Sequence, residues 1–138
     1  EDGEKMRRIG MEFGATTGRP RRCGWLDMVA LRYSVMMNGV TALIMMKSDV
    51  LNDFEKLKVA VAYKVDGKET TEFPYEVNGE IVPVYKEFEG WNCNINGIRN
   101  YDQFPTRLKE YIEFIEKETG VPVKIVSVGP DREETIIR

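Results

Sequence analysis

The chain has 138 residues and a mass of 15.9 kDa, enough for one domain with a core of its own. Its content of 42% hydrophobic and 31% charged residues is typical of a soluble globular protein, and no apolar run approaches the length of a membrane span. A net charge of −3 argues against a general nucleic-acid binder. The chain has no histidine, so a mechanism that needs an imidazole base would have to take it from elsewhere.

The cysteines and the first residues of the chain indicate the cellular compartment to expect and whether the chain is a fragment. Cys23 and Cys93 lack metal-ligand spacing and a supporting histidine, so we expect a pair of reduced thiols in the cytoplasm. The first residues are too polar for a signal peptide. Because the chain begins at Glu1 without a methionine, we expect a fragment of a longer protein.

A donor-rich loop follows a short amino-terminal segment. Residues 1–8 are charged and show little pattern, which indicates a linker or frayed end, and residues 9–13 are expected to form a short strand. The stretch 14–24 then holds three glycines, two adjacent threonines and three arginines. Glycine lets backbone amides turn toward a ligand, while threonine hydroxyls and arginine guanidinium groups add donors suited to a carboxylate or a phosphate. The loop therefore predicts an anion site, although a solvated basic loop that caps the next helix has the same composition.

A buried helix and a buried strand are predicted next. Residues 25–37 are apolar on nearly every side, which indicates a helix covered by other layers, and Asn38-Gly39 supplies its left-handed cap. The almost continuous apolar run 40–46 predicts a parallel strand covered on both faces. A helix followed by such a strand favours an α/β fold. Lys47-Ser48-Asp49 comes directly after this strand, at the carboxyl end where open α/β sheets place their ligands.

The middle third predicts an antiparallel region that carries no recognisable chemistry. Its first strand alternates between apolar and polar residues, as a half-exposed strand does. Asp-Gly and Asn-Gly pairs mark the turns between strands. The expected strands cover 57–65, 68–73 and 81–88, the turns fall at Asp66-Gly67 and Asn78-Gly79, and a loop covers 90–101.

The last third predicts one helix and two strands. Apolar residues at i, i+3, i+4 and i+7 from Leu108 predict an amphipathic helix over 105–119, with a proline in its first turn and a glycine at its end. An apolar strand is expected over 121–128 and a short final strand over 135–137. The first of these strands ends in Ser127-Val128-Gly129-Pro130, which forms a second loop at a strand end.

The two segments at strand ends have the composition of a guanine pocket. The Asp49 carboxylate can accept hydrogen bonds from both N1–H and the 2-amino group of guanine, while Lys47 can lay its methylenes along the base. This is the logic of the Asn-Lys-x-Asp motif of GTPases, with Met46 where asparagine would stand. Gly129 lets the backbone approach a flat ring, and Pro130 offers an apolar face to stack on it. From these residues alone, a solvated tripeptide and an ordinary strand-ending turn are the simpler interpretations.

The donor-rich loop, continued to Asp27, resembles the substrate loop of the adenylosuccinate synthetase family, which joins aspartate to inosine monophosphate (IMP) using GTP. The resemblance extends through 47–51, 85–91 and 127–136, and so covers essentially the whole chain but only the carboxy-terminal part of the family's usual chain. It implies an α/β fold: the carboxy-terminal part of a mainly parallel sheet flanked by helices, with an antiparallel β-hairpin subregion, in a P-loop-NTPase-like family. Residues 1–138 would be the carboxy-terminal domain, without the amino-terminal catalytic part.

The resemblance also implies binding roles residue by residue. The loop would close over aspartate, Arg19 would also reach the IMP ribose, and Arg21 would reach the GTP. The implied aspartate-binding residues are Ala15, Thr16, Thr17, Gly18, Arg19, Pro20 and Arg21. The implied GTP-binding residues are Arg21, Lys47, Ser48, Asp49, Ser127, Val128, Gly129 and Pro130. Pro20 and Cys23 stand where many relatives differ, and Ser48 replaces a more usual leucine, but none of these changes removes a residue on which recognition depends.

The family's reaction phosphorylates the 6-oxygen of IMP from GTP, and the amine of aspartate then displaces the phosphate. The family's catalytic aspartate and histidine, its phosphate loop and its magnesium ligands lie in its amino-terminal part, and none is found in this sequence. The resemblance therefore implies an inactive fragment of a GTP- and Mg²⁺-dependent ligase of AMP biosynthesis and purine salvage. At full length that ligase would be a cytoplasmic homodimer with no nucleic-acid or membrane partner.

Two other functions stay open. A stand-alone guanine-nucleotide-binding module would need none of the missing catalytic groups. An RNA- or anion-binding domain built around the arginine loop would be expected to have a basic overall charge and exposed aromatic residues. This chain is acidic, and its Trp25 falls within the predicted buried helix, so the third interpretation is the weakest.

Overall fold

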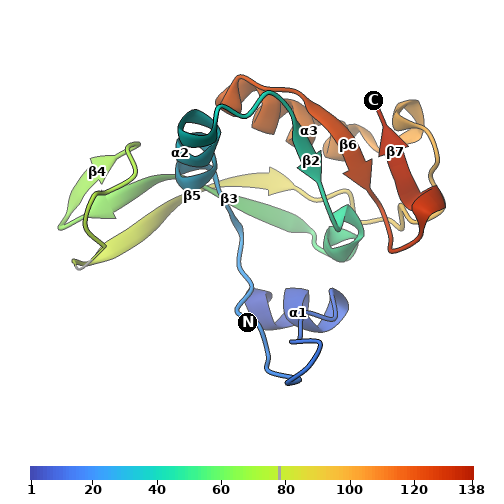
Figure 1. Cartoon of the computed structure of the whole chain (residues 1–138), viewed down its shortest axis with the longest axis horizontal. Coiled ribbons are helices and arrows are strands. Elements are labelled where there is room, and N and C mark those ends of the chain that lie inside the picture. The colour runs from blue at the N-terminus through green and yellow to red at the C-terminus, as the bar shows by residue number, and fades with distance from the viewer. Residues whose placement is uncertain (78) are drawn as a thin grey trace.

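The structure is a computed structural model that describes residues 1–77 and 79–138. The described residues form three α-helices and two small mixed β-sheets (Figure 1). The helices are α1 (Asp2–Ile9), α2 (Met28–Asn38) and α3 (Thr106–Thr119), and none in the described part of the chain is long and apolar enough to cross a membrane. The larger sheet contains β1 (Leu26–Asp27), β3 (Lys56–Val65), β4 (Lys68–Thr70) and β5 (Ile81–Glu89). The smaller sheet contains β2 (Leu43–Met45), β6 (Val123–Ser127) and β7 (Thr135–Ile137).

The larger sheet is built on β3, which pairs in parallel with β1 and antiparallel with β4 and β5. The predicted hairpin turn is confirmed, because Asp66 and Gly67 have φ values of 48° and 80°, the left-handed pair that suits a two-residue hairpin. The return strand β4 ends at Thr70 and is shorter than the expected 68–73. The strand expected over 81–88 is confirmed as β5. The turn expected at Asn78-Gly79 includes Asn78, which lies outside the described residues.

The smaller sheet has the order β2-β6-β7, with β2 and β6 parallel and β6 and β7 antiparallel. The expectation of a mainly parallel sheet therefore holds only in part. Short connections, such as the one from β6 to β7, join antiparallel neighbours, whereas parallel neighbours need a long crossover. Among the described residues β2 pairs with β6 alone, and its Ile44 is 58% exposed. The expectation of a strand covered on both faces is wrong for β2.

Two expectations for the amino-terminal segment are wrong. Residues 1–8 are not frayed but form most of α1, whose acidic first turn and basic last turn suit the helix dipole and whose Met6 is buried. The strand expected over 9–13 is replaced by a turn: α1 runs to Ile9, and Met11 has a left-handed φ of 51°. Only an isolated β-bridge joins Phe13 to Pro20 across the loop that follows.

The helix expected over 25–37 begins later and is less buried than its composition suggests. Asp27 is the N-cap of α2, because its carboxylate accepts a hydrogen bond from the Ala30 amide at 3.0 Å. Met36 and Met37 are 69% and 62% exposed, so α2 is not covered on every side. Its predicted end is confirmed by Gly39, which has a left-handed φ of 57°.

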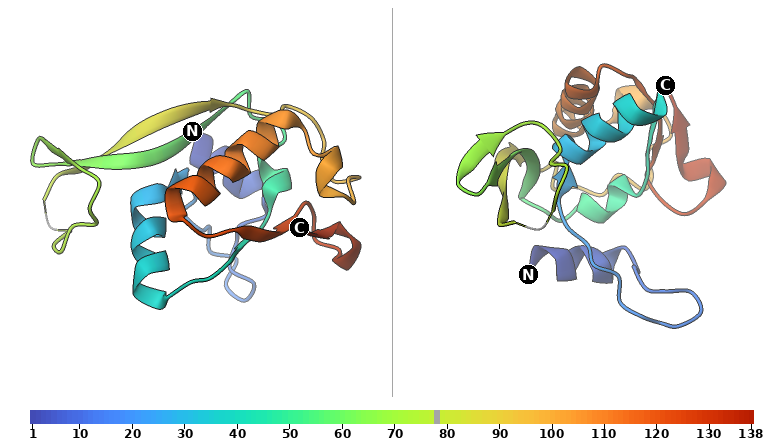
Figure 2. Two further views of the ribbon diagram at one scale, coloured as in Figure 1. Left: turned by 90° about the horizontal axis from the view of Figure 1, so that it is seen from above. Right: turned by 60° about the vertical axis from the view of Figure 1, so that its left-hand side comes forward.

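The core lies between the two sheets and is built around α3 (Figure 2). The predicted apolar face of this helix is confirmed, because Leu108, Tyr111, Ile112 and Ile115 are all buried. On one side α3 meets β5, where the rings of Phe88 and Tyr111 lie edge to face with centroids 5.7 Å apart. On the other side it packs against β6, whose apolar residues belong to the same core cluster. The smaller sheet is therefore fixed to the larger one through α3.

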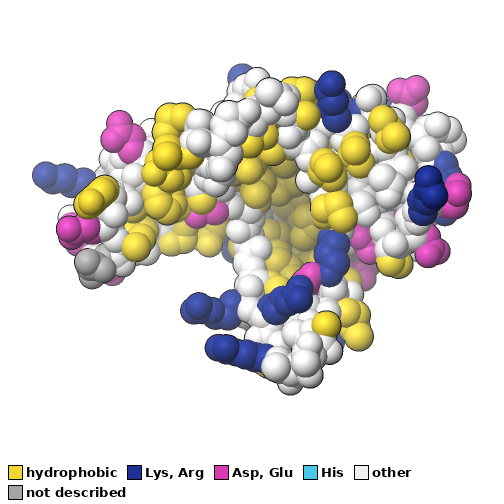
Figure 3. Space-filling view, in the orientation of Figure 1, with side chains coloured by type: hydrophobic (Ala, Val, Ile, Leu, Met, Phe, Trp, Pro, Cys, Tyr) yellow, Lys and Arg dark blue, Asp and Glu magenta, His cyan; other side chains and the backbone are white. Residues whose placement is uncertain are grey.

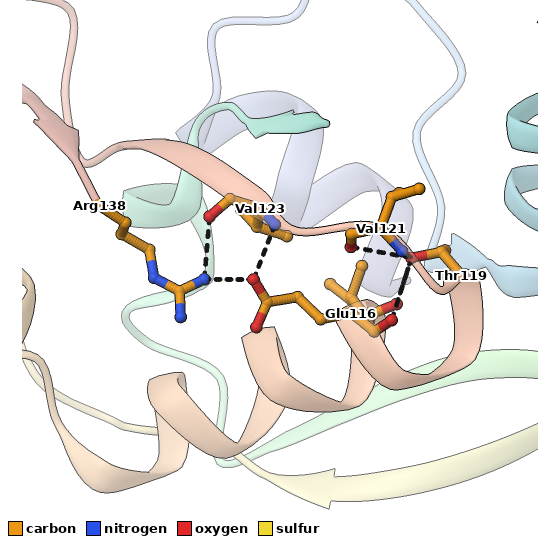
Figure 4. Close-up of polar contacts among 6 residues, drawn as sticks. Glu116, Thr119, Val121, Val123 and Arg138 are labelled. Atoms are coloured by element: carbon orange, nitrogen blue, oxygen red, sulfur yellow. Dashed lines mark hydrogen bonds and ion pairs between the residues drawn. The ribbon is translucent and has the colours of Figure 1, made fainter. Parts of the chain in front are cut away.

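Polar contacts tie the end of the chain to α3 (Figure 4). The Glu116 carboxylate accepts a hydrogen bond from the Val123 amide at 2.7 Å and pairs with the Arg138 guanidinium at 2.5 Å. Arg138 also donates to the Val123 carbonyl at 2.9 Å. One carboxylate on α3 thus holds both the start of β6 and the residue that follows β7.

Candidate functional site

The two predicted guanine-binding segments lie together at one edge of the smaller sheet (Figure 1). Lys47-Ser48-Asp49 directly follows the end of β2, and Ser127-Val128-Gly129-Pro130 begins at the last residue of β6. Because β2 and β6 are parallel, with Met45 opposite Val126, their carboxyl ends reach the same edge. Val128 is fully buried and anchors the second segment in the core. Sequence reasoning put each segment at a strand end, and the parallel pairing brings the two ends side by side.

Lys47 turns the chain away from β2. Its φ of 57° is left-handed, and the 3₁₀-helix η1 (Ser48–Leu51) begins at the next residue. The Lys47 ammonium donates to the Gly10 carbonyl at 2.7 Å and pairs with the Glu12 carboxylate. The turn after α1 thus holds the Lys47 ammonium, while the Lys47 side chain as a whole is about half exposed.

The two residues after Lys47 differ in exposure. Ser48 is 1% exposed, and its hydroxyl has no hydrogen-bond partner within residues 1–77 and 79–138. Asp49 is half-buried, and its carboxylate forms no ion pair or hydrogen bond within the same ranges. A carboxylate without a protein partner is able to accept the two donors that a guanine edge presents.

The end of β6 brings a glycine against a carboxylate. Ser127 donates from its hydroxyl to the Gly129 carbonyl at 2.9 Å. A Cβ atom at Gly129 would overlap the carboxylate of Glu134, which also accepts a hydrogen bond from the Asp131 amide at 3.0 Å. The close approach that Gly129 permits is therefore made by Glu134 in this structure. Pro130 is exposed, so its ring face is open.

The donor-rich loop closes on its own backbone. The Gly14 amide donates to the Arg19 carbonyl at 2.9 Å, and the Gly18 amide donates to the Gly14 carbonyl at 2.8 Å. Gly18 has a left-handed φ of 65°, and a Cβ atom at Gly14 would lie 2.8 Å from the Thr17 hydroxyl oxygen. The left-handed backbone at Gly18 favours glycine, and a side chain at Gly14 would have to displace the Thr17 hydroxyl.

The tip of the loop leaves hydrogen-bond donors unused. Ala15, Thr16 and Thr17 are exposed, and their amides donate to no residue within the two described ranges. Arg19 is exposed as well and has no ion-pair partner in those ranges, while Pro20 lies at the base of the loop. The tip can therefore offer amides, hydroxyls and a guanidinium group to an anion.

Glu12, which the sequence did not single out, joins this loop to the end of β2. Its carboxylate pairs with the Arg21 guanidinium at 2.8 Å and with the Lys47 ammonium, and its carbonyl accepts from the Arg21 amide at 3.0 Å. The hydrogen bonds from Lys47 and Arg21 hold the pKa of Glu12 below its ordinary value. No local pattern marks Glu12 in the sequence, because its partner Lys47 lies 35 residues away.

An apolar cavity of about 370 Å³ opens beside the loop. Figure 3 shows basic side chains grouped over α1 and the loop, next to an apolar hollow. Its lining includes Met6, Trp25, Leu26, Leu43, Met45 and Leu51. None of the predicted site residues lines this cavity, so it is separate from the polar site. In the part of the chain that the structure describes, no cluster of His, Cys, Asp or Glu side chains could hold a metal ion.

Comparisons with known proteins agree on one family. The sequence profile described as Adenylosuccinate synthetase matches residues 1–136. The adenylosuccinate synthetases of Parabacteroides distasonis and Flavobacterium johnsoniae are each 59% identical to the chain, over 138 and 139 residues, covering 100% of it and 33% of their own lengths. The solved structure of fully ligated adenylosuccinate synthetase from Plasmodium falciparum matches with a TM-score of 0.93 and 36% identity, covering 99% of this chain and 34% of that one. The chain thus spans about a third of the length of these relatives.

Proposed function

The chain belongs to the adenylosuccinate synthetase family, and we propose that it is the carboxy-terminal portion of a ligase that joins IMP and L-aspartate using GTP. In that reaction the 6-oxygen of IMP is phosphorylated from GTP, and the amine of aspartate displaces the phosphate to give adenylosuccinate. The part of the work assigned to this chain is recognition. It would hold the guanine base at the edge of the smaller sheet and the aspartate in the donor-rich loop.

The observation that carries the proposal is the parallel pairing of β2 and β6. It sets the Asp49 carboxylate, which has no partner in the described ranges, at the same sheet edge as the exposed ring of Pro130. Guanine presents two donors, N1–H and the 2-amino group, to such a carboxylate, whereas adenine does not. The methylenes of Lys47 on one face of the base and Gly129-Pro130 on the other would complete the pocket.

We assign the tip of the loop to the aspartate substrate. The two carboxylates of aspartate suit the unused amides of residues 15–17 and the hydroxyls of Thr16 and Thr17. Arg19, with no ion-pair partner in the described ranges, would reach the IMP ribose as well, while Arg21, held by Glu12 near Lys47, would reach GTP. An exposed tip is what a loop that closes over its substrate requires.

The remaining chemistry is assigned to the rest of the proposed ligase. Mg²⁺ prefers a set of oxygen ligands, and the described residues offer no such cluster, so no residue of this chain is proposed to hold the metal. When bound in the complete ligase, Mg²⁺ would neutralise charge on the transferred phosphoryl group. The sequence has no histidine to act as a general base near neutral pH. We therefore propose that the chain on its own is catalytically inactive.

The proposal is tested by replacing Asp49 in the complete ligase that contains this chain. Asp49→Asn exchanges an acceptor for an amide donor opposite the 2-amino group of guanine. GTP should bind more weakly by about 2 kcal/mol. Xanthosine triphosphate, which carries a carbonyl at that position, should gain. Steady-state kinetics with both nucleotides gives the two effects as changes in kcat/KM.

Asp53→Asn is the matched control, because Asp53 is an exposed carboxylate four residues further along the chain with no assigned role. This control variant should leave the preference for GTP over xanthosine triphosphate unchanged. Unaltered GTP kinetics in Asp49→Asn would remove Asp49 from the pocket. An equal loss in both variants would point instead to the net charge of the segment.

A further inference from the structure

Glu12 lies between the two parts of the proposed site and contacts both. One oxygen of its carboxylate pairs with the Arg21 guanidinium at 2.8 Å, and the other pairs with the Lys47 ammonium. Lys47 also donates to the Gly10 carbonyl at 2.7 Å, and Arg21 donates its amide to the Glu12 carbonyl at 3.0 Å. The turn after α1 therefore holds the ends of two long cationic side chains that come from different segments.

Glu12 is the less exposed partner in both pairs. Its side chain is 22% exposed, against 59% for Arg21 and 52% for Lys47. Long cationic side chains lose rotamer freedom when they are fixed at one end. A carboxylate that pairs with two such side chains limits where both cations can point. Its lowered pKa agrees with a carboxylate that stays ionised between them.

We propose that Glu12 is a positioning residue that couples the guanine pocket to the aspartate loop. The proposal rests on the proposed function, because it takes Lys47 as the lysine beneath the base and Arg21 as part of the loop. For the Lys47 methylenes to lie along the base, the ammonium must be held beyond the edge of the ring. Glu12 and the Gly10 carbonyl are the groups that hold the ammonium in this structure.

The coupling follows from the shared carboxylate. A base that settles on Lys47 restricts its side chain and therefore the position of Glu12. Glu12 in turn restricts Arg21, at the base of the loop, so that less conformational freedom is left to be lost when aspartate binds. Binding energies are linked reciprocally, so aspartate should improve guanine-nucleotide binding by the same factor. Exposed ion pairs of this kind support a factor of about twofold to fivefold.

The first test is a titration of the labelled chain with guanosine, followed by amide chemical shifts. Guanosine carries no phosphate, so it has no charged group that could reach the loop directly. In the unmodified chain we expect shifts at 47–49 and 127–130 and, in addition, at 14–21. In Glu12→Gln the shifts at the strand ends should persist with affinity changed by less than about twofold, while the loop no longer responds.

Glu4→Gln is the matched control, because it removes the same charge from an exposed ion pair with Arg7 on the neighbouring helix α1. It should behave like the unmodified chain. A loop that still responds in Glu12→Gln, or that never responds while the strand ends do, would overturn the coupling. Strand ends that fail to respond, or that respond equally to adenosine, would overturn the proposed function and the coupling with it.

The second test uses the complete ligase and does not depend on how the Glu12→Gln fragment folds. The dissociation constant of GDP is measured with and without saturating aspartate. The unmodified enzyme should bind GDP about twofold to fivefold more tightly with aspartate present, and Glu12→Gln should abolish this ratio. An unchanged ratio in Glu12→Gln would contradict the assigned role.

Discussion

At the scale of single residues, two buried serines stand at the same edge of the smaller sheet and differ in their bonding. Ser127 is 5% exposed and donates to the Gly129 carbonyl at 2.9 Å. Ser48 is 1% exposed, and its hydroxyl has no partner within 1–77 and 79–138. Burying a hydroxyl without a hydrogen bond costs on the order of 1–3 kcal/mol. The segment that would receive the guanine base thus carries a local energetic cost.

Replacing each serine by alanine should therefore have opposite effects. Ser48→Ala is expected to raise the free energy of unfolding by up to about 1 kcal/mol, since it removes an unbonded hydroxyl. Ser127→Ala is expected to lower it by about 1 kcal/mol, since it removes a bonded one. Urea unfolding of the chain measures both. If Ser48→Ala lost as much stability as Ser127→Ala, the Ser48 hydroxyl would have to be hydrogen-bonded.

Arg19 and Arg21 are expected to act on different substrates although they are neighbours in sequence. In the complete ligase, Arg19→Leu should raise the apparent constants for aspartate and IMP, and Arg21→Leu those for aspartate and GTP. A charge-assisted hydrogen bond contributes about 1.5–3 kcal/mol, so changes of about tenfold or more are expected. Arg22→Leu, an exposed neighbour with no assigned role, is the control. Identical profiles for Arg19→Leu and Arg21→Leu across the three substrates would refute the assignment.

At the scale of elements, α3 connects the sheets and also holds the carboxy-terminal end. Its Glu116 carboxylate serves the Val123 amide and the Arg138 guanidinium at once. Glu110, on the same helix, makes an exposed pair with Arg107 at 3.4 Å and no other ion pair within residues 1–77 and 79–138. The two glutamates share a helix and a charge, but only one of them holds the smaller sheet.

Substitutions at these two glutamates should distinguish the stability contributed by the contact with β6 from the stability contributed by the negative charge. Glu116→Ala should destabilise the chain by about 1–3 kcal/mol, because the partly buried Val123 amide loses its acceptor. Glu116→Gln keeps an oxygen acceptor and should cost less than about 1 kcal/mol. Glu110→Ala should cost no more than about 0.5 kcal/mol, as exposed helix pairs do. Equal losses in thermal or urea unfolding for Glu116→Ala and Glu110→Ala would show that the contact with β6 contributes nothing.

Elements whose signals are local were predicted best. The face of α3 from Leu108 to Ile115 follows from residue spacing and its end from Gly120, and both are confirmed. The short final strand expected over 135–137 is confirmed as β7. The signal for α1 is local as well: acidic residues stand in its first turn and basic residues in its last turn, as the helix dipole favours. A search for apolar periodicity alone does not detect such a helix. The structure shows less burial of α2 and β2 than the sequence predicts, because apolar composition does not reveal which other elements cover a helix or strand. Met36 and Ile44 stay exposed for that reason.

The sequence predicts part of the candidate site, in the same way as it predicts part of the fold. The strand-end positions of Lys47 and Gly129 followed from apolar runs, and their proximity followed once β2 and β6 were taken as parallel. The assigned ligands remain predictions. Glu12 was not predictable, because an ion pair between residues 12 and 47 leaves no periodic mark in the sequence. Nor was Glu134, whose carboxylate fills the space that Gly129 leaves.

At the scale of the whole molecule, the chain should be catalytically silent and yet prefer guanine to adenine nucleotides. Catalytic silence is expected because the sequence has no histidine and because the described residues contain no group of side chains that could hold a metal ion. Residual recognition follows because both strand-end segments are present at one edge. Because the sequence lacks the family's phosphate loop, millimolar affinity, about 4 kcal/mol, is the expected magnitude.

Titration of GDP and ADP into the labelled chain measures this preference, with the Asp49→Asn chain as control. GDP should shift amides at 47–49 and 127–130, and ADP should shift them less. Equal shifts for the two nucleotides, or shifts confined to other regions, would rule out the pocket. Formation of adenylosuccinate by the purified chain would rule out silence.

The side of β2 that faces away from β6 should make the state of the isolated chain depend on its concentration. Only β6 pairs with β2 among the described residues, and Ile44 and Met46 beside that edge are 58% and 65% exposed. A strand edge bordered by exposed apolar side chains is a template for another strand. The Leu43 amide is not among the outward ones, because it donates to the Pro122 carbonyl at 2.8 Å. In dilute solution the β2 amides that point away from β6 should exchange with deuterium at nearly the rate of open backbone. As concentration rises they should become protected, while the amides of α3 show no change.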